Sequence, residues 1–507
     1  MLTALAAVPP AVALGLLLAR VRPVLAAVLA LTSAAVVAAA AFPTPAREWV
    51  PALREVLPTG AEVALILFGG VLLNELTGLA GVNERLAEWL ISACRHPSRA
   101  VVLVLLGVTP FAESVMGFGV GVVVAVPLLR RVGLSPARAS VVGLLGLVTV
   151  PWGALGPGTL VASRFTGVPL RELGVLSALL SPPVFLLAGG CGLVLAVGAS
   201  RARRAVPELL TGVAVLGVSV WAVNATLGVP LAGVLGGLAT VGALLVVARV
   251  RDSRRLSVTP ELVWALRPYA CLVAGLLGVH ALVLVPGVAG TAWYALVSSP
   301  AVWLLVTCAL CPPLLDLSRG EMRMAVRGGM TRWVPVGVTT VVFLLLGALL
   351  TATGMSAALA EAATGLGGGY LVLAPFVGAL GGILTGSNAG ANAMFATSQA
   401  AAAHSLGLQP AALVAVQNVS ASLATMASAP RVALAVGLAR DTGPPTRTPV
   451  RHRAPSRPGD EGDGTAVSAQ TSRNSCPVDQ GSVLRTVLLV DLVVLAFLGL
   501  LTVLLPW

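Results

Sequence analysis

Apolar runs of about 20 residues recur along the whole chain of 507 residues, and short gaps that contain arginine separate them. An α-helix of that length crosses a hydrocarbon core of roughly 30 Å. Only 10% of the residues are charged, which is far below the usual share in a water-soluble domain. Water therefore cannot be the main solvent of this chain, and the pattern predicts an all-α polytopic membrane protein.

The basic residues reflect membrane topology and exclude some functions. The formal net charge is +12, and the basic residues are arginines that lie mainly in the gaps between apolar runs. This placement argues against a nucleic-acid partner. Because the chain contains no lysine, Schiff-base chemistry is excluded. Cys308 and Cys311 have a metal-like spacing, but no second pair completes a tetrahedral site, so we expect neither a metal nor another cofactor.

Two apolar stretches fit poorly as single transmembrane helices. Residues 100–129 and 370–403 are interrupted by proline, glycine and polar side chains, and we interpret both as re-entrant hairpins or unwound helices. The other apolar runs predict about 12 transmembrane helices. Their expected ranges are Leu2–Ala19, Pro23–Phe42, Ala61–Gly81, Ala139–Ser163, Leu173–Ala199, Val206–Val223, Val229–Ala248, Ala270–Val288, Val297–Leu317, Val334–Ala352, Ala411–Leu438 and Val483–Pro506.

Arginine positions predict how the two irregular stretches lie in the membrane, because cytoplasmic loops carry the excess of arginine. If residues 100–129 crossed once, Arg130 and Arg131 would lie on the opposite side from Arg95 and Arg99. A hairpin returns to the same side and makes every strongly basic gap cytoplasmic. The loops that flank 370–403 contain no arginine, so the second hairpin enters from outside. Both termini are then outside, and the expected location is the plasma membrane.

An internal repeat supports two inverted copies. LTGLAGVNERLAEWL from Leu76 resembles ATGMSAALAEAATGL from Ala352. GLSPARA from Gly133 resembles GLQPAAL from Gly407, and this second pair is offset by 274 residues. Since an odd number of predicted spans separates the hairpins, the copies are inverted, as in many transporters. The expected organisation is an N-terminal helix pair and outer loop (1–60), a first repeat (61–205), intervening helices (206–333), a second repeat (334–440), a disordered cytoplasmic linker (441–482) and a last helix (483–507).

Glu113 is the candidate proton carrier. It lies in TPFAESVMGFGVGV, well inside an apolar stretch. A charge at that depth costs on the order of 3 kcal/mol, so the side chain should face a cavity or be protonated. A structural carboxylic acid bonded to unwound backbone is the alternative. Gly117, Phe118 and Gly119 follow, and this glycine-rich break suits a close approach of backbone to substrate.

The second hairpin supplies candidate ligands for an anion. Freed backbone N–H groups at the start of a half-helix can receive a carboxylate, and hydroxyl and amide side chains can complete the donors. Arg431 lies inside the apolar run MASAPRVALAVGL and could pair with the same carboxylate bidentately. The alternative is a polar seam that packs helices. The expected substrate-binding residues in this half are Thr385, Gly386, Ser387, Asn388, Asn392, Gln417, Asn418 and Arg431.

These motifs together resemble the L-lactate permease family, which includes glycolate permeases. The resemblance covers most of residues 62–438 and rests on FAESVMGFGVGVVVAVPLL, VPWGALGPGT, GGILTGSNAGANAMFATSQ and QNVSASLATMASAPRVALA. It implies proton-coupled uptake of a small 2-hydroxymonocarboxylate such as L-lactate, D-lactate or glycolate. The chain departs from the family pattern at Asn388, where an acidic residue is usual, and at Arg431, where glutamine is common.

Other functions remain open from the sequence. The same architecture suits a carrier for another organic anion, coupled to sodium or to protons. A channel could use the hairpins as a continuous pore, and a membrane-embedded enzyme could use Glu113, although no Asp-rich, His-rich or Ser-His-Asp group occurs in the loops. The expected partners are a small carboxylate, protons or sodium, and the lipid bilayer. A homodimer is left open.

Overall fold

The computed structural model describes residues 2–93, 96–117, 119–252, 258–282, 287, 291–441 and 478–504. Within these ranges the ordered elements are helices, and ten helical segments are long and apolar enough to cross a membrane. The predicted all-α polytopic fold is thereby confirmed, whereas the expected total of twelve spans and two hairpins stays a prediction. The predicted linker falls mostly on residues 442–477, which lie outside the described ranges.

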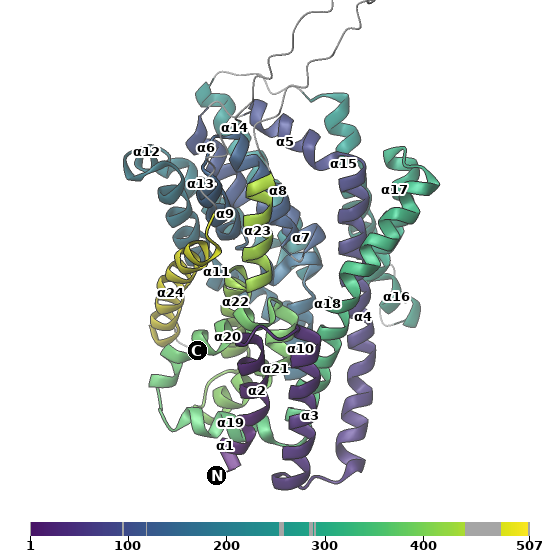
Figure 1. Cartoon of the computed structure of the whole chain (residues 1–507), viewed down its shortest axis with the longest axis vertical. Helices are drawn as coiled ribbons and strands as arrows, with labels where there is room; N and C mark the ends of the chain where they lie inside the picture. The colour runs from purple at the N-terminus through teal and green to yellow at the C-terminus, as the bar shows by residue number, and fades with distance from the viewer. Residues whose placement is uncertain are drawn as a thin grey trace, which may run out of the picture.

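Long helices build the frame of the molecule. Helices α4 (Ala46–Leu79) and α18 (Arg319–Ala352) pack along each other, and α3 (Pro23–Ala41) packs on α18 (Figure 1). The other long helices are α11 (Leu170–Val197), α13 (Val206–Thr226), α14 (Val229–Asp252), α15 (Pro260–Leu282) and α24 (Gln480–Leu504). Shorter helices are α1 (Leu2–Ala6), α2 (Val8–Leu18), α5 (Val82–Ala93), α12 (Ala199–Arg204), α16 (Ala292–Val297), α17 (Pro300–Leu315) and α19 (Met355–Thr364).

Helix α24 shows why these segments need a lipid environment. Val487, Val494 and Leu498 are buried against the protein at helical spacing. The opposite face is apolar as well, with Leu489 64% exposed and Leu500 59% exposed. A helix whose exposed face is largely apolar is stable in hydrocarbon rather than in water.

The two irregular stretches fold as antiparallel helix pairs. In the first hairpin, α6 (Pro97–Leu103), the π-helical turn η1 (Val104–Val108) and α7 (Thr109–Met116) lead to a break, and α8 (Val120–Arg131) returns beside them. The backbone of Gly121 lies close to Thr109, which shows the reversal. In the second hairpin, α20 (Gly369–Thr385) and α21 (Asn388–Ser405) meet at Gly386 and Ser387.

Two segments that were predicted as uninterrupted spans are broken in the structure. The predicted helix Ala139–Ser163 is divided into α9 (Pro136–Leu145), the short helix η2 (Val150–Leu155) and α10 (Pro157–Thr166). The predicted helix Ala411–Leu438 is divided into α22 (Pro410–Ala424), η3 (Thr425–Ala427) and α23 (Ala429–Asp441). The break before α10 follows from backbone conformation, because Ala154, Leu155 and Gly156 have φ values of 40°, 66° and 83°, which are not helical. The break before α23 is at Ser428, whose extended ψ of 142° interrupts the helix.

The breaks of the two copies lie together in the middle of the protein. Helix α10 packs against α21 and α22, and α23 packs against α8 and α9, so each copy supports the broken helices of the other. In Figure 1 the N-terminus and α19 lie at one end of the molecule, while α5, α6 and α12 lie at the other. The arginine-bearing segments 85–93, 96–99 and 201–204 are therefore at the end opposite the N-terminus.

Candidate functional site

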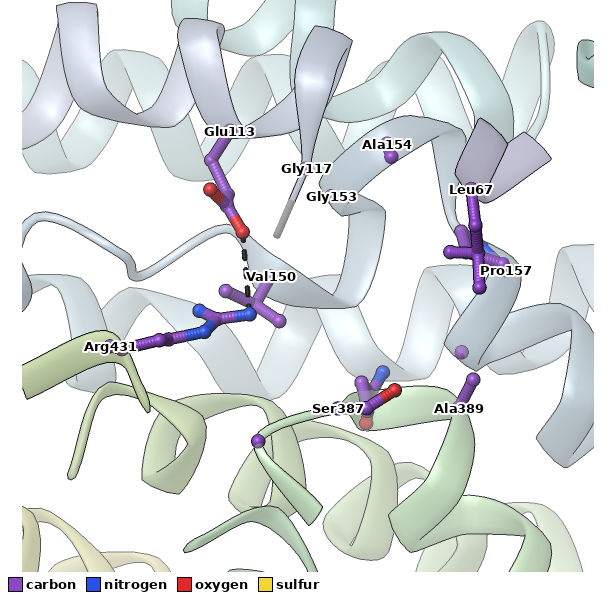
Figure 2. Close-up of a pocket in the computed structure, with 13 residues that line it drawn as sticks. Leu67, Glu113, Gly117, Val150, Gly153, Ala154, Pro157, Ser387, Ala389 and Arg431 are labelled. Atoms are coloured by element: carbon purple, nitrogen blue, oxygen red, sulfur yellow. Dashed lines mark ion pairs between the residues drawn. The ribbon is translucent and has the colours of Figure 1, made fainter. Parts of the chain in front are cut away.

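A cavity forms where the tips of the two hairpins meet. Its volume is about 40 Å³, which leaves room for more than one water molecule. The first turns of α10, α21 and α23 all contribute residues to it, and the side chains of Figure 2 point into the same space. This central cavity is lined by Leu67, Glu113, Gly117, Val150, Gly153, Ala154, Pro157, Gly158, Gly386, Ser387, Asn388, Ala389 and Arg431.

Glu113 lies on α7 in the wall of the central cavity, with 1% of its surface exposed. Its Oε1 atom accepts a hydrogen bond from the backbone N–H of Gly119 at 3.1 Å, and its Oε2 atom accepts one from Gly121 at 3.2 Å. Both donors belong to the start of α8, where a helix N-terminus stabilises negative charge. The first hairpin therefore encloses its own carboxylate at the tip.

The tip of the first hairpin requires glycine at residue 117. Gly117 has φ 68° and ψ −168°, a conformation that only glycine adopts readily. An added Cβ would lie 2.4 Å from the Cβ of Ala154 on η2. Gly117 thus allows close packing of the tip against η2, and Gly119 donates to Glu113. Phe118, the remaining predicted residue of this tip, lies outside the described residues.

Arg431 reaches the central cavity from the first turn of α23. It is 7% exposed, and its Nη2 atom lies 3.5 Å from Oε1 of Glu113, as the dashed line in Figure 2 marks. That distance is an ion pair rather than a well-formed hydrogen bond. The Nη1 atom of Arg431 is buried and has no hydrogen-bond partner among the described residues. A buried guanidinium with unused donors beside a cavity is a recognition element for a planar oxyanion.

The second hairpin closes the cavity with a capped helix start. The Ser387 hydroxyl accepts from the backbone N–H of Gly390 at 3.4 Å, and the Thr385 hydroxyl donates to the carbonyl of Ser387 at 2.8 Å. Gly386 has φ 61°, which ends α20 and turns the chain into α21. Gly386, Ser387 and Asn388 line the central cavity. Thr385 stabilises the turn and lines a second, larger space next to the central cavity.

Asn392 and Asn418 form a buried network behind the cavity rather than its wall. The amide of Asn392 donates to Oδ1 of Asn418 at 2.9 Å, and the amide of Asn388 donates to the same oxygen at 2.8 Å. The amide of Asn418 donates to the hydroxyls of Thr159 and Ser177 at 3.1 Å and 2.9 Å. Both asparagines are fully buried. The network joins α10, α11, α21 and α22 and holds Asn388 in position.

Gln417 lies apart from the residues that line the central cavity. Its Oε1 atom accepts from Nε2 of Gln399 at 3.3 Å, and Tyr370 donates to Oε1 of Gln399 at 2.8 Å. This contact joins α20, α21 and α22. Among the predicted site residues that the structure describes, those that line the central cavity together are Glu113, Gly117, Gly386, Ser387, Asn388 and Arg431.

Replacing Asn418 by alanine is expected to destabilise the protein by about 3 kcal/mol, because the change leaves several buried polar partners unsatisfied. Unfolding of the purified protein in detergent, followed by circular dichroism, measures this loss. Ser405→Ala is the matched control, since the Ser405 hydroxyl bonds only within its own helix in an exposed position. Weaker substrate binding by Asn418→Ala at unchanged stability would contradict the supporting role of the network.

Sequence reasoning missed the wall that α10 contributes. Pro157 begins this helix and Gly158 lies against Asn388, where an added Cβ would be 2.4 Å from Nδ2 of Asn388. The first turns of α10 and α21 both line the cavity, and a helix start adds positive potential to the space beside it. The signal was present in the run WGALGPG, whose glycines and proline mark a helix break.

A larger space connects with the central cavity. This vestibule has a volume of about 590 Å³ and is lined by residues of α3, α4, α8, α18 and α23 and by residues 385–387. Gly386, Ser387 and Arg431 line both spaces. The vestibule follows α23 from Arg431 to Leu438, so it gives an entry path to the guanidinium.

The fold and the site define a polytopic α-helical membrane protein with a charged cavity at the meeting of two helical hairpins. The sequence model of the L-lactate permease family matches residues 3–259 and 283–443. The chain therefore belongs to the L-lactate permease family, and the predicted resemblance is confirmed.

Individual relatives are distant in sequence. The L-lactate permease of Streptococcus iniae is 23% identical over 387 residues, which cover 69% of this chain and 79% of the relative. The putative L-lactate permease of Haemophilus influenzae is 20% identical over 416 residues, which cover 71% of this chain and 78% of the relative. The L-lactate permease of Salmonella typhi is 35% identical over 103 residues, covering 20% of this chain and 19% of the relative.

Proposed function

We propose that this protein is a secondary active transporter that carries a small 2-hydroxymonocarboxylate, such as lactate or glycolate, together with protons across the plasma membrane. The observation that carries the proposal is the buried, partly unsatisfied guanidinium of Arg431 beside Glu113 in the central cavity. The names of the relatives, which are L-lactate permeases, support the choice of substrate.

The chemistry of the cavity suits a carboxylate. Arg431 supplies a fork of donors that matches two carboxylate oxygens, and helix N-termini add positive potential from several directions. Ser387 and Asn388 are polar side chains in the same wall, within reach of a ligand hydroxyl in this small space. Leu67, Val150 and Ala154 leave an apolar side for a short carbon chain. A small hydroxy acid has each of these features.

The ion pair explains how a proton would be coupled to the anion. With Glu113 ionised, the carboxylate already neutralises Arg431, and a second carboxylate would meet a like charge in a medium of low dielectric constant. Protonation of Glu113 removes that charge and leaves the guanidinium for the substrate. The loaded cavity then contains one positive and one negative charge, so the proton and the anion are bound together.

The vestibule suggests the side on which this conformation is open. It runs from Arg431 toward the end of α23, and Asn74 and Arg332 line its other wall. If the arginine-rich end of the molecule is cytoplasmic, as the distribution of arginines predicts, the structure is an inward-facing conformation with both termini outside. Transport then requires a second conformation in which the central cavity opens to the outside.

Uptake by proteoliposomes tests this function. Labelled lactate, glycolate and pyruvate are presented to the purified full chain with an imposed pH gradient, with a sodium gradient and with neither. We expect saturable uptake, counterflow, and accumulation that follows the pH gradient. Uptake that never saturates would indicate a channel. Accumulation driven by a sodium gradient alone would identify sodium as the coupling ion instead of the proton. An absence of lactate and glycolate uptake would overturn the proposal.

A further inference from the structure

A second, strongly basic cavity lies away from the central cavity. Its volume is about 370 Å³, and it is formed by residues 96–99 at the start of α6, by Val197 at the end of α11, by α12 and by the first turn of α13. These elements lie together at the arginine-rich end of the molecule (Figure 1). The polar residues that line it include Ser98, Arg99, Arg201, Arg204 and Glu208.

Glu208 fixes one wall of this basic cavity. It is 3% exposed, and its Oε1 atom accepts from Nε of Arg99 at 2.9 Å and from Nη1 of Arg251 at 2.8 Å. Arg251 comes from the last turn of α14. A carboxylate held by two arginines positions both guanidinium groups.

The other wall carries arginines without counter-charges. Arg201 and Arg204 are three residues apart on α12 and both line the cavity. Neither makes an ion pair with any residue that the structure describes. The three arginines and one glutamate that line the cavity leave a formal charge of +2. Such a cavity attracts a phosphate group, for which arginine has matching geometry.

The position of the basic cavity along the membrane-length helices indicates the source of its ligand. It lies at the common end of four membrane-length segments, because 97–116 and 206–226 begin beside it and 170–197 and 229–251 end beside it. That is the level at which an apolar helix surface meets lipid headgroups. Next to the cavity, Val194 on α11 is 46% exposed, and Val206 and Leu210 on α13 are 40% and 50% exposed.

We infer that this basic cavity binds the phosphate headgroup of an anionic membrane phospholipid. The arginines receive the phosphate, and the exposed apolar side chains of α11 and α13 receive the acyl chains. A free phosphate ion would use only the first of these two surfaces. Basic pockets between transmembrane helices are known to recognise anionic lipid headgroups by this combination.

Lipid binding to the purified full chain tests the inference. Native mass spectrometry in detergent counts bound phosphatidylglycerol against added phosphatidylglycerol, with phosphatidylcholine and inorganic phosphate as separate competitors. We expect one saturable phosphatidylglycerol site that millimolar inorganic phosphate does not empty. Arg201→Gln and Arg204→Gln are each expected to weaken binding about fivefold, as for one arginine contact near a membrane surface.

Arg203→Gln is the matched control, because Arg203 lies on the same short helix, is exposed and does not line the cavity. Binding by this variant should equal that of the unmodified protein. Equal weakening by Arg203→Gln and Arg204→Gln would show diffuse surface attraction and overturn the inference. Displacement of the lipid by inorganic phosphate would also overturn it, since the site would then belong to a soluble anion.

Discussion

Glu113→Gln is expected to abolish accumulation of substrate driven by a pH gradient, while exchange of substrate across the membrane continues in part. Glutamine keeps the size of the side chain and can still accept one backbone N–H at the hairpin tip, but it carries no titratable proton. The cavity becomes permanently able to bind the anion, because Arg431 has lost its competing carboxylate. Gradient-driven uptake and counterflow of labelled lactate in proteoliposomes measure the two effects separately.

Glu88→Gln is the control for this experiment. Glu88 is 70% exposed and lies 3.6 Å from Arg131, and surface pairs of this kind contribute little. Accumulation of lactate by the Glu88→Gln variant should match that by the unmodified protein. Accumulation by Glu113→Gln at the unmodified level would remove Glu113 from the coupling mechanism, and only its structural role at the tip of the first hairpin would remain.

Arg431→Gln is expected to reduce uptake on the order of 100-fold, mainly through weaker substrate binding. The change removes the cation that the proposal assigns to the substrate carboxylate and leaves Glu113 buried without its counter-charge, and truncating a buried charge pair typically costs about 2–5 kcal/mol. Initial rates of lactate uptake over a range of concentrations separate KM from the maximal rate. Arg431→Lys should recover part of the loss, since lysine restores the charge but not the fork.

Two further variants separate binding from folding. The double variant Glu113→Gln/Arg431→Gln removes both buried charges, so its stability should exceed that of Arg431→Gln, while uptake stays low. Arg164→Gln changes an exposed arginine in the last turn of α10 and should leave KM unchanged. An unchanged KM in Arg431→Gln would contradict a contact between Arg431 and the substrate carboxylate.

The amino-acid pattern predicted the parts of the site that depend on local composition. At the 274-residue offset of the predicted repeat, Glu113 falls opposite Ser387, and both residues line the central cavity. Polar residues and glycines inside apolar runs are costly in lipid, so their position alone indicates a cavity or a helix break. For the same reason the interruptions near Gly117 and Gly386 could be recognised before any contact was known.

The parts that escaped prediction depend on contacts between distant segments. Glu113 and Arg431 are far apart in the chain, and nothing in either segment shows that their side chains meet. Ala154 adopts a left-handed conformation that its residue type does not favour, so the break before α10 was predicted as continuous helix. Asn418 stays a predicted binding residue, and its bonds to Asn388, Thr159 and Ser177 could not be predicted, because a buried amide looks the same in sequence whether its partners are protein groups or a ligand.

The hydrogen bonds from Gly119 and Gly121 make the charge of Glu113 part of the shape of the first hairpin. A neutral carboxyl group accepts such bonds more weakly than a carboxylate does. Loss of the negative charge on Glu113 would therefore weaken the two hydrogen bonds that join its side chain to the start of α8. Under the proposed coupling, a proton on Glu113 would change both the charge of the central cavity and the hydrogen bonds that close the tip of the first hairpin.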